Sequence, residues 1–409
     1  MSSSTRCSGN RRASLLVAAL AAAVASGCGH RPARVARHLG PAEPGARPRV
    51  ALLPIDNLSG TSAPVKELLA DLERALGGRL DVVDAADVEG FLARHRLRHT
   101  GGIDGASARA AREELGANAV LVTSLTVYSA ALPPALGLTA RLVSTGDEPD
   151  ILWMDAFAWA GDQAPGLLGL GRMDRMAAVQ ERVLARLTAS LGAFLAGESR
   201  DVECGGRRYR PKVRYRSAAL DSHQPRTLAV VPFLDHSNRR GAGEAVALEF
   251  VRQLVASGQY RVLEPGVVRD YLLRARVLIP GGVSLETTRL ILGGLGADTV
   301  LSGVVLDFDE RARAATAIRF RAVLLDSSGD VLWSSSSFNR GDDGVFLFGL
   351  GRVGNSLDLT CRMVTGVVDR LHRPGGTSVA WARPENDPRA FVGAAKDARA
   401  AKRSGSAGR

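Results

Sequence analysis

The stretch RVALLPIDNLSG at residues 49–60 returns, with the same apolar and polar pattern, as TLAVVPFLDHSN at residues 227–238. Three further pairs follow in the same order: LGANAVLVTSL (115–125) with LGADTVLSGVV (295–305), DILWMDAFAW (150–159) with DVLWSSSSFN (330–339), and GDQAPGLLGLGRM (161–173) with GDDGVFLFGLGRV (341–353). The offset is 178 residues at the first pair and 180 at the other three. Such a steady shift over about 120 residues indicates an internal duplication. We therefore predict a first copy at 48–198 and a second copy at 226–373.

Both copies predict the same series of elements. A short apolar strand ends at a proline and a polar turn, and an amphipathic helix follows. The apolar residues with helical spacing are Leu68, Leu69, Leu72 and Leu76 in the first copy, and Val246, Leu248, Phe250, Val251 and Leu254 in the second. A brief strand, two short helices, three strands, a glycine-rich loop and a long helix complete each copy. The order β-α-β-α-α-β-β-β-α predicts an α/β (α+β) fold, built as two mixed-sheet sandwiches in tandem.

The amino terminus carries the features of a secretory signal. Arg11 and Arg12 precede a short apolar run that is too short to span a membrane. The run ends in Ala25-Ser26-Gly27-Cys28, which resembles the lipobox of bacterial lipoproteins. That resemblance implies a lipoprotein signal peptide at 1–27 and a lipid anchor, palmitate included, on Cys28.

Two details bear on where the mature protein resides. The residue after Cys28 is Gly29, where an aspartate would favour the inner membrane, so we expect the periplasmic face of the outer membrane. Alternatively, Ala23-Val24-Ala25 is a site for ordinary signal peptidase, and the protein is then released without a lipid.

The positive charge of the chain lies mostly outside the two copies. The formal net charge is +11, and residues 1–48, 199–217 and 373–409 together carry about +16, which leaves about −5 for the rest. This distribution argues against nucleic acid as a partner. We expect basic linkers at 28–47 and 199–225 and a disordered basic tail at 374–409. Within the second linker, residues 207–216 either run extended, add a strand to one sheet, or rest on anionic lipid.

The segment FLFGLGRVG at 346–354 contains the spacing G-x-G-x-x-G of dinucleotide-binding loops. It follows the last predicted strand instead of the first, and the first copy has Asp174 where the second has Gly354, so we expect no cofactor here. Both copies keep an apolar Gly-Leu-Gly-Arg loop. Either the loop covers its sheet edge or it docks on a partner. The candidate partner residues are Leu167, Leu168, Leu170, Arg172, Phe346, Phe348, Leu350 and Arg352.

The motifs of familiar enzymes and metal sites are missing from the sequence. Asp235-His236-Ser237 has the composition of a catalytic triad, but adjacent residues do not converge in that way, and a turn explains them. His95 and His99 share a helical spacing without a third ligand nearby. Cys204 and Cys361 remain once Cys28 is modified, and they either pair in an oxidising compartment or stay free. We predict no catalytic residues, no metal and no enzyme activity.

The first strands and their turns, the segments GANAVL and GADTVLSG, and the strands DILW and GDVLW resemble the periplasmic α/β domains of the curli-secretion lipoprotein CsgG and of the TolB amino-terminal region. The resemblance covers roughly 300 of the 409 residues. It implies an envelope protein that binds other proteins. The chain departs from CsgG in lacking extra membrane-inserting hairpins and from TolB in lacking a propeller.

These observations lead to one main hypothesis and two alternatives. The main hypothesis is an outer-membrane lipoprotein that acts as a scaffold or an assembly or transport accessory, with the membrane and unidentified envelope proteins as partners. The first alternative is an oligomeric secretion-channel component of the CsgG type. The second is a small-ligand-binding module, which requires a deep polar pocket near the ends of the first strands.

Overall fold

The computed structural model describes residues 47–163, 171–198, 204–206, 208–222, 225–277, 279, 283–310, 316–343, 345 and 351–371. All of these residues belong to one compact unit of the chain. The predicted signal peptide, Cys28 and the predicted basic tail lie outside the described residues. Among the helices of these ranges, none has the length and apolar character needed to cross a membrane.

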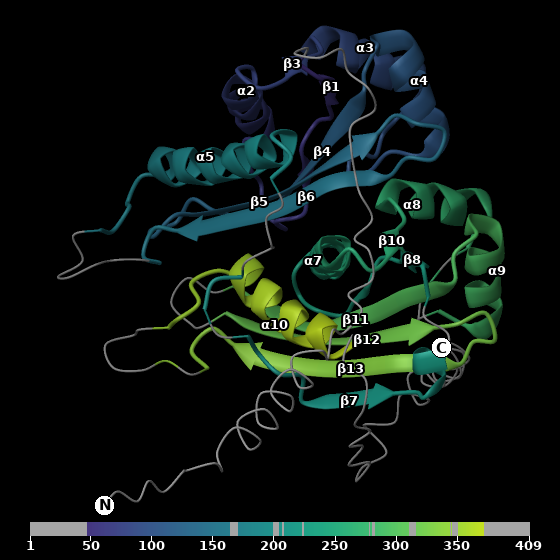
Figure 1. The fold of residues 1–409 in the computed structure, drawn as a ribbon. Helices are drawn as coiled ribbons and strands as arrows, with labels where there is room; N and C mark the ends of the chain where they lie inside the picture. The colour runs from purple at the N-terminus through teal and green to yellow at the C-terminus, as the bar shows by residue number, and fades with distance from the viewer. Residues whose placement is uncertain are drawn as a thin grey trace, which may run out of the picture. The chain divides into compact units, whose positions relative to one another are not determined.

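The first copy forms a mixed sheet with helices on both faces (Figure 1). Its strands are β1 Arg49–Leu52, β2 Asp56–Asn57, β3 Asp81–Val82, β4 Ala119–Ser129, β5 Ala135–Ser144 and β6 Ile151–Ala160. Its helices are α2 Val65–Leu76, α3 Ala85–Arg94, α4 Gly105–Leu115 and α5 Met176–Leu195. The strand order is β3-β1-β4-β5-β6, in which β1 runs parallel to both neighbours and β4, β5 and β6 form an antiparallel meander.

The second copy repeats this topology strand for strand. Its strands are β8 Thr227–Val230, β9 Leu234–Asp235, β10 Arg261–Val262, β11 Thr299–Asp309, β12 Ala317–Leu325 and β13 Val331–Arg340. Its helices are α7 Ala242–Ser257, α8 Pro265–Arg274, α9 Leu285–Leu295 and α10 Ser356–Leu371. The order β10-β8-β11-β12-β13 confirms the predicted fold class, two mixed-sheet sandwiches in tandem.

Part of the expected linker 199–225 belongs to the second sheet. Strand β7, Val213–Arg216, pairs antiparallel with β13, and the short helix α6, Ala219–Ser222, follows it. Of the three courses predicted for residues 207–216, the added strand is observed for Val213–Arg216. Pairing satisfies backbone groups that an extended linker would leave to water.

Local sequence explains where several helices begin and end. The side chain of Asp84 accepts a hydrogen bond from the first turn of α3, and the side chains of Asp104 and Ser284 do the same for α4 and α9. Helices α4 and α9 both stop at a glycine with a left-handed backbone, Gly116 at φ 64° and Gly296 at φ 61°. The predicted apolar face of α2 is buried through Leu68, Leu72 and Leu76.

Helix α7 differs from the amphipathic helix that the sequence predicts. Every residue from Ala245 to Val255 is buried. The reason is that α7 packs on β11 of its own sheet and also on β6 of the first copy, and α10 likewise contacts both β13 and β6. The layer formed by α7 and α10 is therefore shared by the two sheets, whereas α2 and α5 pack against the first sheet.

Candidate functional site

The bases of the two glycine loops have the same geometry in both copies. The backbone N–H of Met173 donates to the carbonyl of Gly161 at 2.9 Å, and that of Val353 donates to Gly341 at 2.8 Å. A Cβ atom on Gly161 or on Gly341 would collide with the carbonyl oxygen opposite, so each base requires glycine. Each loop therefore leaves its sheet and returns through a closed stem.

Only the ends of the predicted partner loops are described. Arg172 and Arg352 are exposed at those ends, and the Nε atom of Arg172 donates to Asp174 at 2.7 Å. The apolar residues Leu167, Leu168, Leu170, Phe346, Phe348 and Leu350 lie outside the described residues. Their role in docking or in covering the sheet edge therefore stays a prediction.

The two loop bases are hydrogen-bonded to each other. The Nε2 atom of Gln163, at the first base, donates to Oδ2 of Asp358 at 2.7 Å. Asn355, at the second base, donates from Nδ2 to Oε1 of Gln163 at 3.1 Å and to Asp358 at 3.0 Å. A side chain of the first copy thus joins the beginning of α10 in the second. No local pattern around Gln163 signals this bridge, because its partners lie about 190 residues away in the chain.

Asp358 is half-buried within this bridge. Burial raises the pKa of its carboxyl, and the hydrogen bonds from Asn355 and Gln163 and the charges of Arg362 and Arg252 offset that rise in part. The first copy has the apolar Ala178 at the corresponding position of α5. This half-buried acid is therefore a feature of the interface between the copies and not of the fold itself.

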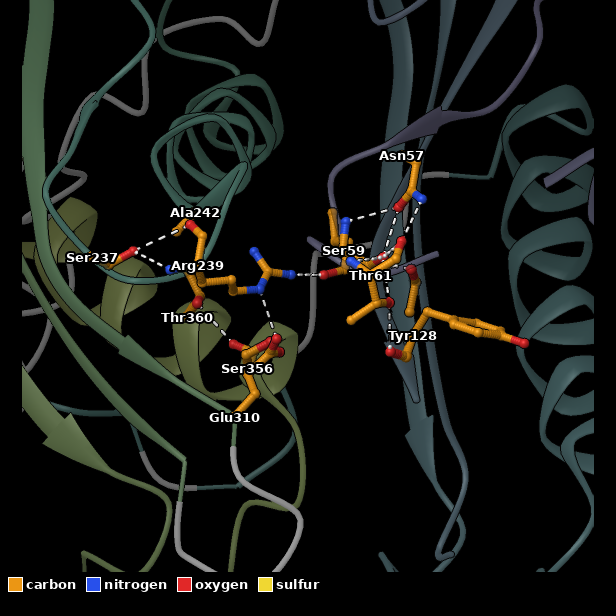
Figure 2. A network of polar contacts seen from close by, with 12 residues as sticks. Asn57, Ser59, Thr61, Tyr128, Ser237, Arg239, Ala242, Glu310, Ser356 and Thr360 are labelled. Atoms are coloured by element: carbon orange, nitrogen blue, oxygen red, sulfur yellow. Dashed lines mark hydrogen bonds and ion pairs between the residues drawn. The ribbon is translucent and has the colours of Figure 1, made fainter. Parts of the chain in front are cut away.

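A second contact holds the same end of α10 (Figure 2). The Nε atom of Arg239 donates to Oε2 of Glu310 at 2.7 Å, and Glu310 in turn accepts from the hydroxyl of Ser356 in α10. The guanidinium group lies 4.4 Å from the centre of the Phe308 ring and donates to the backbone carbonyl of Thr126 in the first copy. Arg239 therefore connects both copies to the first turn of α10.

Arg239 emerges from a turn that both copies share. The Oδ1 atom of Asn57 accepts from the backbone N–H of Ser59 at 3.1 Å, and that of Asp235 accepts from the N–H of Ser237 at 3.0 Å. These are Asx turns, so Asp235-His236-Ser237 forms the turn that the sequence predicts. Two residues further on, the copies differ. The hydroxyl of Thr61 donates to the backbone carbonyl of Tyr128 within the first copy, whereas Arg239 of the second copy donates to the carbonyl of Thr126 in the first.

A buried ion pair lies deeper in the interface between the copies. Arg141 on β5 and Glu264 before α8 are both 0% exposed and join at 2.7 Å, with further bonds from the Nε atom of Arg141 to the same carboxylate. Arg141 also donates to the carbonyl of Gly101 at 2.6 Å. Glu264 caps α8, as the exposed Asp84 caps α3. The same capping position thus acquires a second role in the second copy only.

Cys204 and Cys361 are joined as a disulfide, with their Cα atoms 5.6 Å apart. Together with Glu249 they form the group of possible metal ligands found among the described residues. Arg252 donates to Cys361 at 2.7 Å and to both carboxylate oxygens of Glu249, and it reaches Asp155 of the first copy. A metal ion would have to displace this buried cation, so the cluster does not fit a metal site.

The remaining polar candidates are structural or exposed. The Nε2 atom of His95 lies 2.5 Å from the carboxylate of Glu114, and His99 is exposed. Near the end of β1, Glu244 pairs with Arg269, and burial raises the pKa of the Glu244 carboxyl. A hollow of about 750 Å³ is lined in part by Arg47 and Asp81, at the amino ends of β1 and β3. The small-ligand hypothesis needs a pocket at the opposite, carboxyl ends.

Comparisons with known proteins were made for sequence families, curated proteins and solved structures. No family model matches the chain, and no curated protein matches it. The chain is similar to the PelC dodecamer from Paraburkholderia phytofirmans, at 16% identity over 39% of this chain and 94% of that chain, with a TM-score of 0.26. It is similar to lipoprotein GNA1162 from Neisseria meningitidis, at 22% identity over 36% and 98%, TM-score 0.26. It is also similar to the LpoB C-terminal domain from Salmonella enterica, at 19% identity over 28% and 83%, TM-score 0.24.

These TM-scores are too low for the likenesses to bear on function. The matched shares of this chain, 28% to 39%, each amount to less than half of it. The resemblance to the CsgG and TolB domains stays a prediction from the sequence.

Proposed function

We propose that this chain is a non-catalytic lipoprotein of the bacterial cell envelope, anchored through Cys28 to the outer membrane, that binds partner proteins through its two glycine loops. The observation that carries the proposal is the bridge from Gln163 to Asn355 and Asp358. Because the bases of the two loops are bonded to each other, the loops begin side by side. A partner can then be bound by both loops at once, which raises its affinity above that of either loop alone.

The carboxyl ends of the first strands support a role without catalysis. Ligand sites of α/β sheets usually form there. In this chain the position is taken by the two Asx turns and by contact between the copies, in which Gly241, at φ 78°, packs against the backbone of Leu58. A Cβ atom at residue 241 would collide with that backbone, so the contact between the copies requires glycine at this position.

The anchor is tested by metabolic labelling. Cells that express the full chain are grown with labelled palmitate, and the mature protein is followed through membrane fractionation. We expect label on the wild-type chain in the outer-membrane fraction and none on Cys28→Ala. Unlabelled wild-type protein in the soluble fraction would contradict the anchor and favour the ordinary signal-peptidase site.

The loops are tested by crosslinking in intact envelopes. One variant changes Leu167, Leu168 and Leu170 to serine, a second changes Phe346, Phe348 and Leu350 to serine, and a third, Gln163→Leu, leaves both loops intact but removes the bridge. We expect each variant to lose the same crosslinked partners. Leu273→Ser, which changes an exposed leucine of α8 and leaves both loops and the bridge in place, is the matched control. Unchanged crosslinks in all three variants would remove the loops as the binding site.

A further inference from the structure

The far end of the first sheet carries apolar and aromatic side chains at the surface. We call this surface the aromatic end, defined by Tyr128, Leu132, Phe157, Trp159, Met173 and Met176. Leu132, in the turn between β4 and β5, is 63% exposed, and the other five residues are partly buried against the core of the first copy. Figure 2 shows the Tyr128 ring directed away from the network that its carbonyl oxygen joins.

The second copy does not repeat this surface. Trp159 pairs with Leu136 and Phe157 pairs with Leu138, and the positions with the same register in the second sheet are Asn339 and Ser337. Both of these are buried and polar. The turn between β4 and β5 reads ALPP, whereas residues 310–313 of the second copy read ERAR. The aromatic end is therefore not a by-product of the fold, since the fold forms without it.

Two arginines of α5 border the aromatic end. The guanidinium group of Arg182 lies 3.9 Å from the centre of the Trp159 ring, and that of Arg186 lies 5.6 Å from the Phe157 ring. Both arginines are exposed. A guanidinium group stacked on a ring still presents N–H donors at its edge, and these suit phosphate oxygens.

The side chains are ordered along the sheet. Leu132 lies beyond the strand ends, Tyr128 and Trp159 share the next rung through Leu136, and Phe157 follows one rung further. From the turn inward, the exposed Leu132 comes first, then the rings of Tyr128 and Trp159, and then the arginines that lie beside the rings of Trp159 and Phe157. It matches a membrane interface, where aliphatic groups reach the acyl chains, Tyr and Trp occupy the headgroup level, and arginines contact phosphates.

From this arrangement we propose that the aromatic end is a contact surface for an anionic lipid membrane. The proposal rests on the anchor at Cys28, because 18 residues lie between Cys28 and Arg47, the first described residue. Such a segment spans at most about 65 Å. That length keeps the folded part close to the membrane that holds its lipid, so even weak contacts are populated.

The experiment uses the full chain with Cys28→Ser, which removes the lipid and leaves every described residue unchanged. Partitioning is measured on vesicles of phosphatidylethanolamine with phosphatidylglycerol and on vesicles of phosphatidylcholine alone. We expect Leu132→Ser to lower partitioning about tenfold, since burying a leucine is worth about that factor. We expect Arg182→Gln and Arg186→Gln each to lower it about fivefold, and on the anionic vesicles only.

Matched controls come from the second copy. Leu273 on α8 is 64% exposed, almost as Leu132 is, and Arg319 lies 4.9 Å from the ring of Phe338, so Leu273→Ser and Arg319→Gln should leave partitioning unchanged. Quenching of tryptophan fluorescence by brominated lipid should fall in Trp159→Phe. Absence of partitioning, or equal losses in Leu132→Ser and Leu273→Ser, overturns the proposal and leaves a protein as the partner of this surface. Neither result affects the palmitate test of the anchor.

Discussion

One face of the sheet is covered by helices of the other copy in the first copy, but the corresponding face of the second copy is not covered in this way. In the first copy this face carries small residues at Gly137, Ala156 and Ala158, and the helix layer of the second copy packs on it through contacts such as Leu357 with Ala158. At the positions with the same register, the second copy carries Arg319, Ser336 and Phe338, and Arg319 is exposed. Arg319 and Phe338 are far larger than Gly137 and Ala158, so they would obstruct helices packed in the same way. The two copies therefore differ on this face, because the first accommodates α7 and α10 there and the second carries larger side chains.

The largest expected effect contrasts two helix caps at the same position. Glu264→Ala leaves Arg141 buried without its counter-ion, which typically costs about 3–5 kcal/mol of unfolding free energy. Asp84→Ala removes an exposed cap of α3 and should cost about 1 kcal/mol. Urea unfolding of the two variants measures both values. Equal losses would mean that the buried pair adds nothing to the interface.

Removing the disulfide should have the next largest effect. Cys204 and Cys361 are 157 residues apart and join the segment before β7 to α10, so Cys361→Ser should cost about 2–4 kcal/mol. Thermal unfolding with and without a reductant is the measurement. The reductant should lower the midpoint of the wild type and leave Cys361→Ser unchanged. An unchanged wild type under full reduction would show that the bond does not contribute.

Exchanging residues of the shared face should have a smaller effect. Ala158→Phe places the second copy's side chain under α10 and should cost about 1–3 kcal/mol through overpacking. The reverse change, Phe338→Ala, removes a partly exposed ring and should cost less than half as much. Denaturation midpoints compare the two. A harmless Ala158→Phe would contradict the described packing of the two copies.

The smallest expected effect concerns the pH dependence of the loop bridge. Burial raises the pKa of Asp358 in the folded state, so the folded protein binds a proton at this site more tightly than the unfolded chain does. The resulting stabilisation is complete below the ordinary pKa of aspartate, near about 4, and is lost as the pH rises through the folded-state pKa.

Asp358→Asn should therefore raise the unfolding free energy at pH 7 by roughly 0.5–1 kcal/mol and flatten its decline between acid and neutral pH. Denaturant unfolding curves of the wild type and of Asp358→Asn, collected from acid to neutral pH, measure both effects. The exposed Asp174 at the base of the first loop supplies the control, since Asp174→Asn should change neither quantity. A wild-type stability that rises with pH in step with Asp358→Asn would contradict the assignment.

Much of each copy could be predicted from local sequence. The last of the three strands predicted for the first copy is β6, Ile151–Ala160, and the long helix predicted after the glycine-rich loop is α5, Met176–Leu195. The apolar periodicity of Leu68, Leu72 and Leu76 correctly identified the buried face of α2. Such features depend on residues a few positions apart, so a single copy of the sequence contains the whole signal.

The candidate site could be predicted only in outline. The repeated Gly-Leu-Gly-Arg segments pointed to two loops of one kind, and their closed bases are alike. The bridge at Gln163 and the reach of Arg239 were missed, because the turn around Arg239 has the same local pattern as that around Thr61. The two turns differ in their surroundings, because β4 of the first copy lies next to Arg239 and accepts its hydrogen bond.

The sequence by its own pattern indicates that the chain contains two copies of one α/β unit, since periodicity and an internal offset need no knowledge of the third dimension. That α7 and α10 of the second copy are shared by both sheets is visible only in the tertiary structure. Residues 123 positions apart, such as Arg141 and Glu264, become neighbours there. Helix α7 is buried on all sides because sheets of both copies pack against it, and the hydrophobic pattern along the chain does not specify which distant segment covers a helix.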